Sequence, residues 1–191
     1  MGDWAGNAAF DGTLRAAQGG DELAFAAVWR WLHPPLLRWL TVVAPGGVED
    51  VASEVWLTVT RSLGAFEGDE RNFRAWVFTV ARRRAIDWAR RRKREPLCAP
   101  LDEFDVADPS ATSSSLVDAD IALEAALTLL QQLTPDQREV VALRVVAGLT
   151  VSETAAIVDK SDGAVRVLSH RALRTLAQQL GADRLTRGVT V

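Results

Sequence analysis

The sequence predicts an all-α protein built from two small helical domains that are joined by a flexible acidic linker. Three observations support this fold class. Apolar residues make up 48% of the 191 positions and recur at three- and four-residue spacings, as they do on helices that bury one face. All seven tryptophans lie at or before Trp88, which predicts different cores for the two halves. From Glu95 to Asp120 there are three prolines, seven acids and no basic residue, a composition typical of a linker.

The first half is expected to contain three helices, at residues 21–43, 48–63 and 72–94. Glycine and proline interrupt the helical pattern between them. On the third helix the apolar side chains share one face and the arginines fall largely on other faces, so the helix can pack on one side and present cations on another. We expect Trp76, on the apolar face, to be a core residue.

Charge is distributed unevenly along the chain. From Arg71 to Arg94 there are ten basic residues and one acid, a local net charge of +9. Because the whole chain carries −3, the remainder carries −12. This separation is typical of a polyanion-binding surface on an acidic body, although a solvated helix face or a flexible tail has the same composition. Charge alone leaves these interpretations open.

The second half predicts a helix-turn-helix. Thr134 with Gln137, and Thr150 with Glu153, have the spacing of capping boxes, and each pair begins a helix. The first helix ends before a glycine and the second runs to about residue 158. Ser161 is a suitable cap for a third helix at about 162–180. A short helix, a three-residue turn and a longer helix form a helix-turn-helix.

The third helix of this half has two contrasting faces. Val165, Leu168, Ala172 and Leu176 form a stripe that must be buried. The opposite arc holds Arg166, Val167, His170, Arg171 and Arg174. A helix in the major groove needs one face held by its domain and another able to donate to guanine edges and phosphates. The alternative is an ordinary surface helix that carries arginines. The two capped helices at helix-turn-helix spacing favour DNA binding.

Several other classes of protein are disfavoured. The chain has no Gly-rich phosphate loop and no Ser/His or Cys/His pair within a motif, so the enzyme interpretation is poor. A single cysteine, Cys98, forms no internal disulfide, and His33 and His170 lie too far apart for a zinc motif. We therefore expect no metal and no cofactor. No stretch approaches the roughly 20 apolar residues of a membrane span, so we expect a cytoplasmic protein without membrane insertion.

Both halves resemble a known family. The segment GVEDVASEVWLTVTRSLGAFEGDERNFRAWVFTVARRRAIDWARRRKRE is similar to the second conserved region of the extracytoplasmic-function (ECF) class of bacterial RNA polymerase sigma factors, and LTPDQREVVALRVVAGLTVSETAAIVDKSDGAVRVLSHRALRTL is similar to the fourth. The resemblance implies a region 2 domain at 1–95, the acidic linker at 96–120 and a region 4 domain at 121–191. It implies a non-catalytic factor that directs core RNA polymerase to promoters, recognises their −35 and −10 elements, promotes strand opening and is held inactive by an anti-sigma factor.

The resemblance also implies roles for individual residues. Facing the clamp helices of the polymerase large subunit are Glu49, Asp50, Val51, Glu54, Val55 and Trp56. The family usually has glutamine where Ser53 stands. Around the −10 element, where the loop at 65–72 receives a flipped base, the implied residues are Phe66, Gly68, Asp69, Asn72, Arg74, Arg82, Arg83, Arg90 and Arg91. At the double-stranded −35 element they are the arc from Arg166 to Arg174, with Ser161 and Asp162 near phosphates. The family commonly has glycine where Asp159 stands, and aspartate tolerates the left-handed turn needed there.

Two other interpretations remain from the residues alone. One is a conventional helix-turn-helix repressor or activator whose tryptophan-rich half binds a ligand or dimerises. The basic segment at 71–94 disfavours it, because a sensor domain has no need of a local +9. The other is a protein that acts chiefly through an occluding partner, which describes regulation more than activity.

Overall fold

The structure is a computed structural model that describes residues 7–94 and 128–187. The predicted acidic linker at 96–120 lies outside these ranges. In the first half the elements are α1 (Asn7–Gln18), α2 (Glu22–Val43), α3 (Val48–Ser62), the short 3₁₀ helix η1 (Leu63–Ala65) and α4 (Glu70–Arg94). In the second half they are α6 (Pro135–Val141), the π-helix η3 (Ala142–Val146), α7 (Val151–Val158) and α8 (Asp162–Arg187).

The all-α prediction is confirmed over the described residues, which contain helices and no strand. Two side chains explain where α2 and α4 begin. Asp21 accepts hydrogen bonds from the backbone N–H groups of Leu23 and Ala24, so it caps α2 from one position outside it. Asp69 accepts from the N–H of Asn72 at 2.8 Å, and α4 therefore begins at Glu70, two residues earlier than expected. Across 7–94 and 128–187, no helix is both long and apolar enough to cross a membrane.

Helix α1 is an element that our sequence analysis missed. Its residues Phe10, Leu14 and Ala17 have helical spacing and are buried, and α1 packs against α2 and more lightly against α4. Helix α1 therefore belongs to the core of the first half.

The capping boxes of the second half are both confirmed, with Thr134 paired to Gln137 and Thr150 paired to Glu153. After α7 the chain turns at Asp159, whose φ of 54° and ψ of 52° lie in the left-handed region. The expectation that aspartate tolerates this turn is thus confirmed. Helix α8 continues to Arg187, beyond the predicted end near residue 180.

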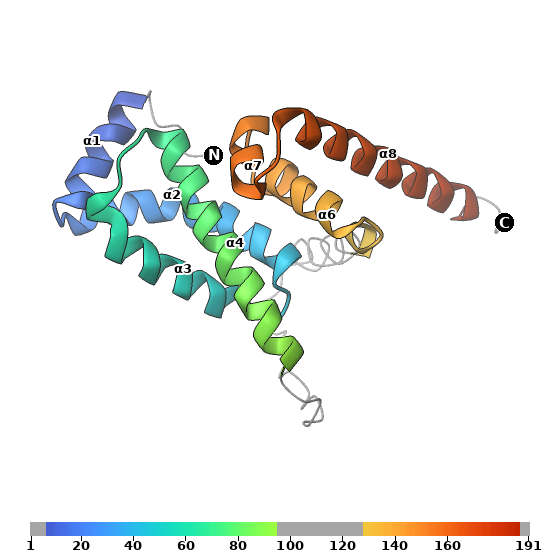
Figure 1. Cartoon of the computed structure of the whole chain (residues 1–191), viewed down its shortest axis with the longest axis horizontal. Coiled ribbons are helices and arrows are strands. Elements are labelled where there is room, and N and C mark those ends of the chain that lie inside the picture. The colour runs from blue at the N-terminus through green and yellow to red at the C-terminus, as the bar shows by residue number, and fades with distance from the viewer. Residues whose placement is uncertain (1–6, 95–127, 188–191) are drawn as a thin grey trace.

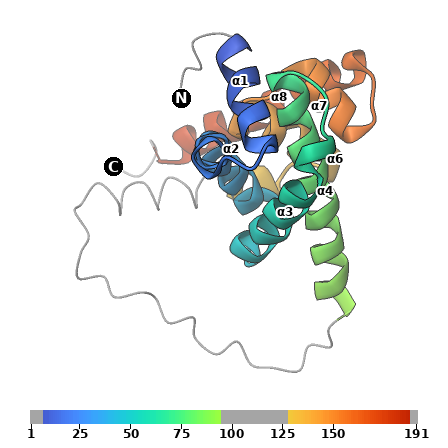
Figure 2. The ribbon, with the colours of Figure 1, turned by 90° about the vertical axis from the view of Figure 1, so that its left-hand side faces the viewer.

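The two halves pack against each other, as Figures 1 and 2 show. Helix α7 lies on α4, and η3 lies on α2. One continuous apolar cluster contains residues of both halves, including Val77 of α4 and Leu143 of η3. The prediction of two different cores is therefore wrong for this arrangement. That prediction used the positions of the tryptophans, which indicate only the interior of each half. The two halves meet through aliphatic side chains, and the tryptophans carry no information about those.

Candidate DNA and polymerase interfaces

Helix α8 exposes the residues predicted to read duplex DNA. Its inner stripe is anchored by Val165 and Ala172, both fully buried. The opposite arc is solvent-exposed and consists of Arg166, Val167, His170, Arg171 and Arg174. At the start of the helix, Ser161 Oγ accepts the N–H of Ala164 at 3.2 Å. The exposed face is thus long, cationic and fixed in orientation by its buried side, as insertion into a groove requires.

The start of α8 contains one ion pair that bears on this surface. Arg166 Nη2 lies 3.4 Å from Asp162 Oδ2, one turn earlier on the same helix, and both side chains are about half exposed. Such a pair contributes at most about 1 kcal/mol in water. Arg166 therefore remains free to exchange this carboxylate for a phosphate or a base edge.

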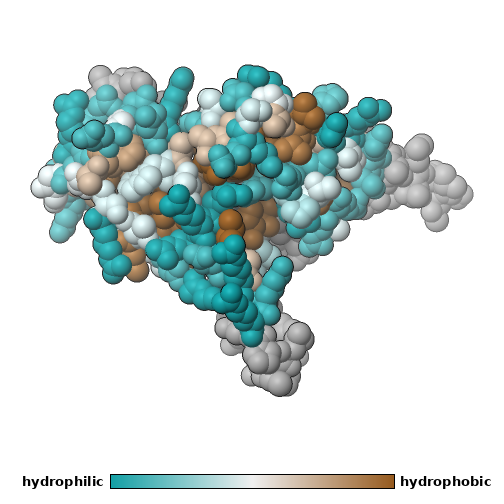
Figure 3. Space-filling view, viewed as in Figure 1, coloured by the Kyte–Doolittle hydropathy of each residue, from teal (hydrophilic) through white to brown (hydrophobic). Residues whose placement is uncertain are grey.

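Helix α4 carries a second cationic surface. Its C-terminal half exposes Arg83, Arg90, Arg91 and the following basic residues to Arg94. In Figure 3 hydrophilic side chains cover this end of α4. The cations of α4 and those of α8 thus lie on different helices, in different halves of the chain.

Two arginines predicted to contact the −10 element instead bind the second half in this structure. Arg82 Nε donates to Glu139 Oε1 at 2.6 Å and Arg82 Nη2 donates to Oε2 at 3.2 Å. This hydrogen bond raises the pKa of Arg82. Arg74 Nη2 donates to the backbone carbonyl of Ala147, beside Gly148, where an added Cβ would lie 3.3 Å from the same nitrogen. Both guanidinium groups are therefore occupied by partners in the second half of the chain.

The loop before α4, predicted to capture a base, is packed around an aromatic pair. Phe66 stacks on Trp76 with ring centroids 5.1 Å apart and meets Phe73 edge-on at 5.3 Å. Trp76, predicted as core, is partly buried and packs against the core. Gly68 has a φ of 149°, and a Cβ there would lie 2.7 Å from the Cβ of Asn72. Only glycine fits this turn.

The residues predicted to face the polymerase fall into two groups. Glu49 and Asp50 are exposed at the start of α3. Val51 and Val55 are buried, and Trp56 is 8% exposed with its Nε1–H donating to His33 Nδ1 at 3.0 Å. These three apolar side chains build the core and offer almost no surface for a direct contact. The accessible part of the predicted face is acidic.

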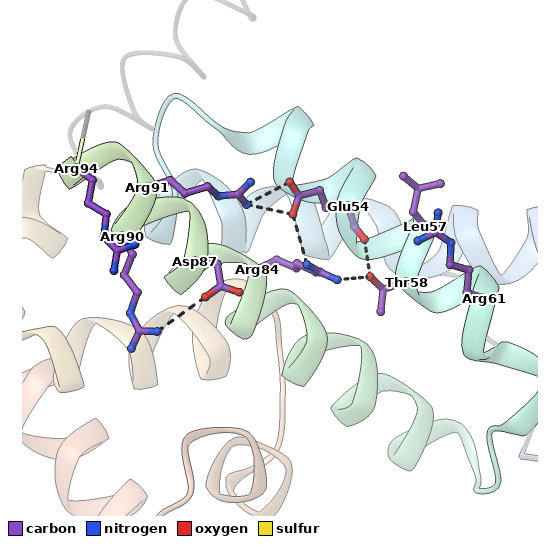
Figure 4. Close-up of a pocket in the computed structure, with 9 residues that line it drawn as sticks. All are labelled: Glu54, Leu57, Thr58, Arg61, Arg84, Asp87, Arg90, Arg91 and Arg94. Carbon is purple, nitrogen blue, oxygen red and sulfur yellow. Dashed lines mark hydrogen bonds and ion pairs between the residues drawn. The ribbon is translucent and has the colours of Figure 1, made fainter. Parts of the chain in front are cut away.

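Glu54 belongs to a groove between α3 and α4, shown in Figure 4. Its carboxylate lies 3.2 Å from Arg91 and 3.8 Å from Arg84, and Arg84 also donates to Thr58 Oγ1 at 3.0 Å. The groove has a volume of about 550 Å³ and is lined by Glu54, Leu57, Thr58, Arg61, Arg84, Asp87, Arg90, Arg91 and Arg94. Five arginines meet two carboxylates there, so the groove is net positive and suited to phosphate.

Sequence reasoning missed several residues of these surfaces. Glu139 contacts Arg82, 57 positions earlier. The Gln18 side chain donates to the backbone carbonyls of Leu63 and Phe66, 45 and 48 positions later. No local pattern reveals such partners. The sequence could have placed Arg61 and Arg84 in one groove, since α3 and α4 are adjacent amphipathic helices that had to pack together. Over 7–94 and 128–187, no group of three His, Cys, Asp or Glu side chains is arranged to hold a metal ion.

The family model Sigma-70 region 2 matches residues 27–95, and Sigma-70, region 4 matches residues 123–176. The ECF RNA polymerase sigma factor ShbA of Streptomyces griseus is 36% identical over 177 residues, which cover 84% of this chain and 91% of that protein. SigD of Mycobacterium tuberculosis, another ECF sigma factor, is 33% identical over 183 residues, covering 90% and 84%.

A third relative is longer. The ECF sigma factor BldN of Streptomyces coelicolor is 31% identical over 172 residues, which cover 89% of this chain and 65% of BldN. Among solved structures, CnrH in complex with the cytosolic domain of CnrY has a TM-score of 0.67 at 22% identity, covering 90% of this chain and 96% of that one. RpoE of Bartonella quintana, solved with the anti-sigma factor NepR, has a TM-score of 0.63 at 22% identity, covering 83% and 98%. These two structures share the fold. With both regions matched in order and relatives above 30% identity aligned over most of their length, the chain belongs to the ECF family of RNA polymerase sigma factors.

Proposed function

We propose that this sigma factor divides promoter recognition between its halves, with α8 reading the duplex −35 element and α4 with the loop at 65–72 holding the opened −10 element. The domain limits proposed for this division are 1–95, 96–120 and 121–191, and the matched regions at 27–95 and 123–176 support them. The observation that carries the proposal is the presence of two exposed cationic surfaces on α8 and α4, each held by a separate buried face.

The two surfaces suit different forms of DNA. The arc on α8 offers arginines that reach outward from a rigid helix, which is the arrangement that reads base edges in a major groove. The surface of α4 is more densely charged, and the aromatic pair Phe66 and Trp76 lies about two helical turns before Arg83, the first arginine of that surface. Aromatic rings beside a cationic track are typical of single-strand binding, because bases stack while phosphates follow the charge.

Simultaneous binding requires the halves to separate. The two elements are named for positions about 25 base pairs apart, which is about 85 Å along B-form DNA. In the structure α7 packs on both α4 and α8, and α8 itself is about 39 Å long. The chain between Arg94 and Thr128 has a maximum reach of about 110 Å. A closed factor therefore reaches one element at a time, and an opened one has sufficient chain to reach both.

For polymerase binding we propose the exposed acids Glu49 and Asp50, with Glu54 after exchange of its arginine partners. Val51, Val55 and Trp56 support this face from within the core. Acids at the first turn of α3 also interact favourably with the helix dipole, so the same residues serve the fold and the partner. The proposed partner surface on the polymerase is basic.

An anti-sigma factor is the second protein partner that we propose, supported by the family and by RpoE, which was solved with the anti-sigma factor NepR. We further propose that the chain catalyses no reaction and acts in the cytoplasm, where core polymerase and promoter DNA are found.

Run-off transcription with core RNA polymerase and a genomic promoter library tests the central proposal. We expect the chain to direct initiation at a subset of promoters that share an upstream and a downstream element. Core polymerase without the chain is the control. Failure to direct initiation, combined with sequence-specific binding that blocks transcription by a second sigma factor, would identify a repressor instead.

A second experiment tests the loop. Replacing Phe66 and Asn72 with alanine should leave polymerase recruitment and upstream binding nearly intact and reduce the opening equilibrium by about 30- to 1000-fold, since one stacking and one polar contact are lost. Permanganate probing of unpaired thymines measures opening, and a premelted template should restore activity. Normal opening by the double variant would remove the base-capture role.

A further inference from the structure

Helix α1 lies before the matched region 2, which begins at residue 27, and its last residue contacts the loop at 65–72. We propose that Gln18 is a positioning residue for strand opening, which holds the backbone of this base-capture loop from α1. The inference rests on the proposed role of the loop.

The contact is made by one side-chain amide. Gln18 Nε2 donates to the carbonyl oxygen of Leu63 at 3.0 Å and to that of Phe66 at 2.7 Å. Because both partners are carbonyl oxygens, only the nitrogen of the amide serves both bonds. Leu63 O also accepts the N–H of Phe66 at 3.1 Å. Gln18 thereby joins the end of α3 to the residue that begins the aromatic part of the loop.

The amide is not needed by its own helix. Helix α1 is closed at its end by backbone bonds, from Gly19 N–H to Arg15 O at 3.0 Å and from Gly20 N–H to Ala17 O at 3.1 Å. Both bonds from Gln18 instead span 45 or more positions of sequence and are partly buried. The side chain is therefore committed to the loop.

A second residue of α1 supports the same loop through ring contacts. Phe10 is fully buried, and its ring centroid lies 5.8 Å from that of Phe73. Phe73 in turn meets Phe66 edge-on at 5.3 Å. Helix α1 thus holds the loop backbone through Gln18 and the loop aromatic through Phe10 and Phe73. Base capture requires the ring of Phe66 and the amide of Asn72 to stand at fixed positions. A displacement of about 1 Å in such a site removes much of its effect.

The test compares substitutions that separate hydrogen bonding from shape. Gln18→Met keeps the length of the side chain and removes the donor, and Gln18→Glu keeps its shape and aims oxygen at both carbonyls. Gln18→Lys restores a donor that reaches both. Gln178→Met, at an exposed position of α8, is the matched control. Opening is measured on a duplex promoter with the full chain and core polymerase, at a temperature where circular dichroism shows every variant folded.

We expect Gln18→Met to reduce the opening equilibrium by about 5- to 30-fold, the range for losing one or two neutral hydrogen bonds, and Gln18→Glu to reduce it more. Gln18→Lys should recover most of the loss and Gln178→Met should show none. A premelted template should restore all variants, because a loop that captures no base is then bypassed. If the loss came from a general folding defect, neither the lysine donor nor the premelted template would restore opening.

The opening equilibria of the Gln18 variants are compared with that of the variant in which Phe66 and Asn72 are both alanine. If that variant loses opening while Gln18→Met and Gln18→Glu open normally, the positioning role is wrong and the base-capture role stands. A loss in Gln18→Met that Gln18→Lys and the premelted template both fail to restore would also overturn it. If the double variant opens normally, base capture fails and the positioning role fails with it.

Discussion

Removing the carboxylate of Glu139 should separate the two halves of the chain. In the closed structure this side chain binds Arg82 through two parallel bonds of 2.6 and 3.2 Å. Substitution Glu139→Ala leaves Arg82 without its partner, and solvent reaches the guanidinium most readily when region 4 moves away. The expected result is a shift from the closed toward the open arrangement.

The size of the shift follows from burial. The side chains of Arg82 and Glu139 are 29% and 22% exposed, between a surface pair, which contributes up to about 1 kcal/mol, and a buried pair, whose disruption costs about 3–5 kcal/mol. The geometry is bidentate, which favours the stronger end of the surface range. We therefore expect a change of about 1–2 kcal/mol, or roughly 5- to 30-fold in the ratio of open to closed chains.

Energy transfer between two dyes measures this ratio. The dyes are attached at Arg15→Cys on α1 and Gln178→Cys on α8, both exposed positions, after Cys98, the only cysteine, has been replaced by serine. Glu139→Ala should lower the transfer efficiency. Lys160→Ala is the matched control, since it breaks a 3.0 Å ion pair with Asp136 that lies within the second half.

Binding of a single-stranded −10 oligonucleotide supplies the second measurement. Glu139→Ala should increase its affinity by up to the same 5- to 30-fold, because the competent arrangement becomes more populated. Arg82→Ala should also lower the transfer efficiency but should not increase affinity, because the cation itself is lost. Unchanged transfer in Glu139→Ala, or equal gains in affinity for both variants, would refute the reasoning.

Four further predictions concern single features. Arg166→Ala should lose about 1–3 kcal/mol of promoter discrimination, and equal losses on matched and scrambled upstream elements would restrict Arg166 to phosphate. Glu49→Arg with Asp50→Arg should weaken co-purification with core polymerase while leaving α8 able to bind duplex DNA; unchanged co-purification would exclude this face. Asp159→Gly should raise the free energy of unfolding by about 1 kcal/mol by relieving the left-handed turn, a gain that denaturant titration measures and that a loss would contradict. Burial lowers the pKa of His33 below its ordinary value of 6.5, so the native state binds this proton less readily than the unfolded chain; stability should be full above about pH 6.5 and decline as pH falls through the lowered pKa, and His33→Gln should flatten that decline.

The helices that the sequence predicted best are those with chemical end signals. Thr134 and Thr150 each combine a hydroxyl with a Gln or Glu three residues later, and such reciprocal bonds depend only on local spacing. Helix α1 was missed because its segment lacks a cap of this kind and carries only a short apolar pattern. Its burial depends on α2, a partner that local spacing does not reveal.

The candidate polymerase face illustrates a limit of amphipathic patterns. Along α3 the apolar positions Val51 and Val55 alternate with acids, and a pattern of this kind identifies an apolar face without saying what covers it. The structure covers it with the core of the first half. The acids on the other side were available to sequence reasoning, because charged side chains are almost never fully buried without a partner.

The arginines of α4 show a related limit, because a charge pattern does not reveal which cations are already paired within the chain. Each is a strong candidate for phosphate from charge alone, yet Arg82 and Arg91 are already paired, with Glu139 and Glu54. A carboxylate and a phosphate compete for one guanidinium in the same geometry, so an unspecific polyanion must displace these acids before it binds the full surface. Under the proposed function a promoter offers more, since the proposed contacts of α8 and the proposed base capture at Phe66 accompany the exchange. On this proposal, the pairing within the chain reduces binding to arbitrary DNA more than binding to a promoter, so that a local charge of +9 is compatible with selective recognition.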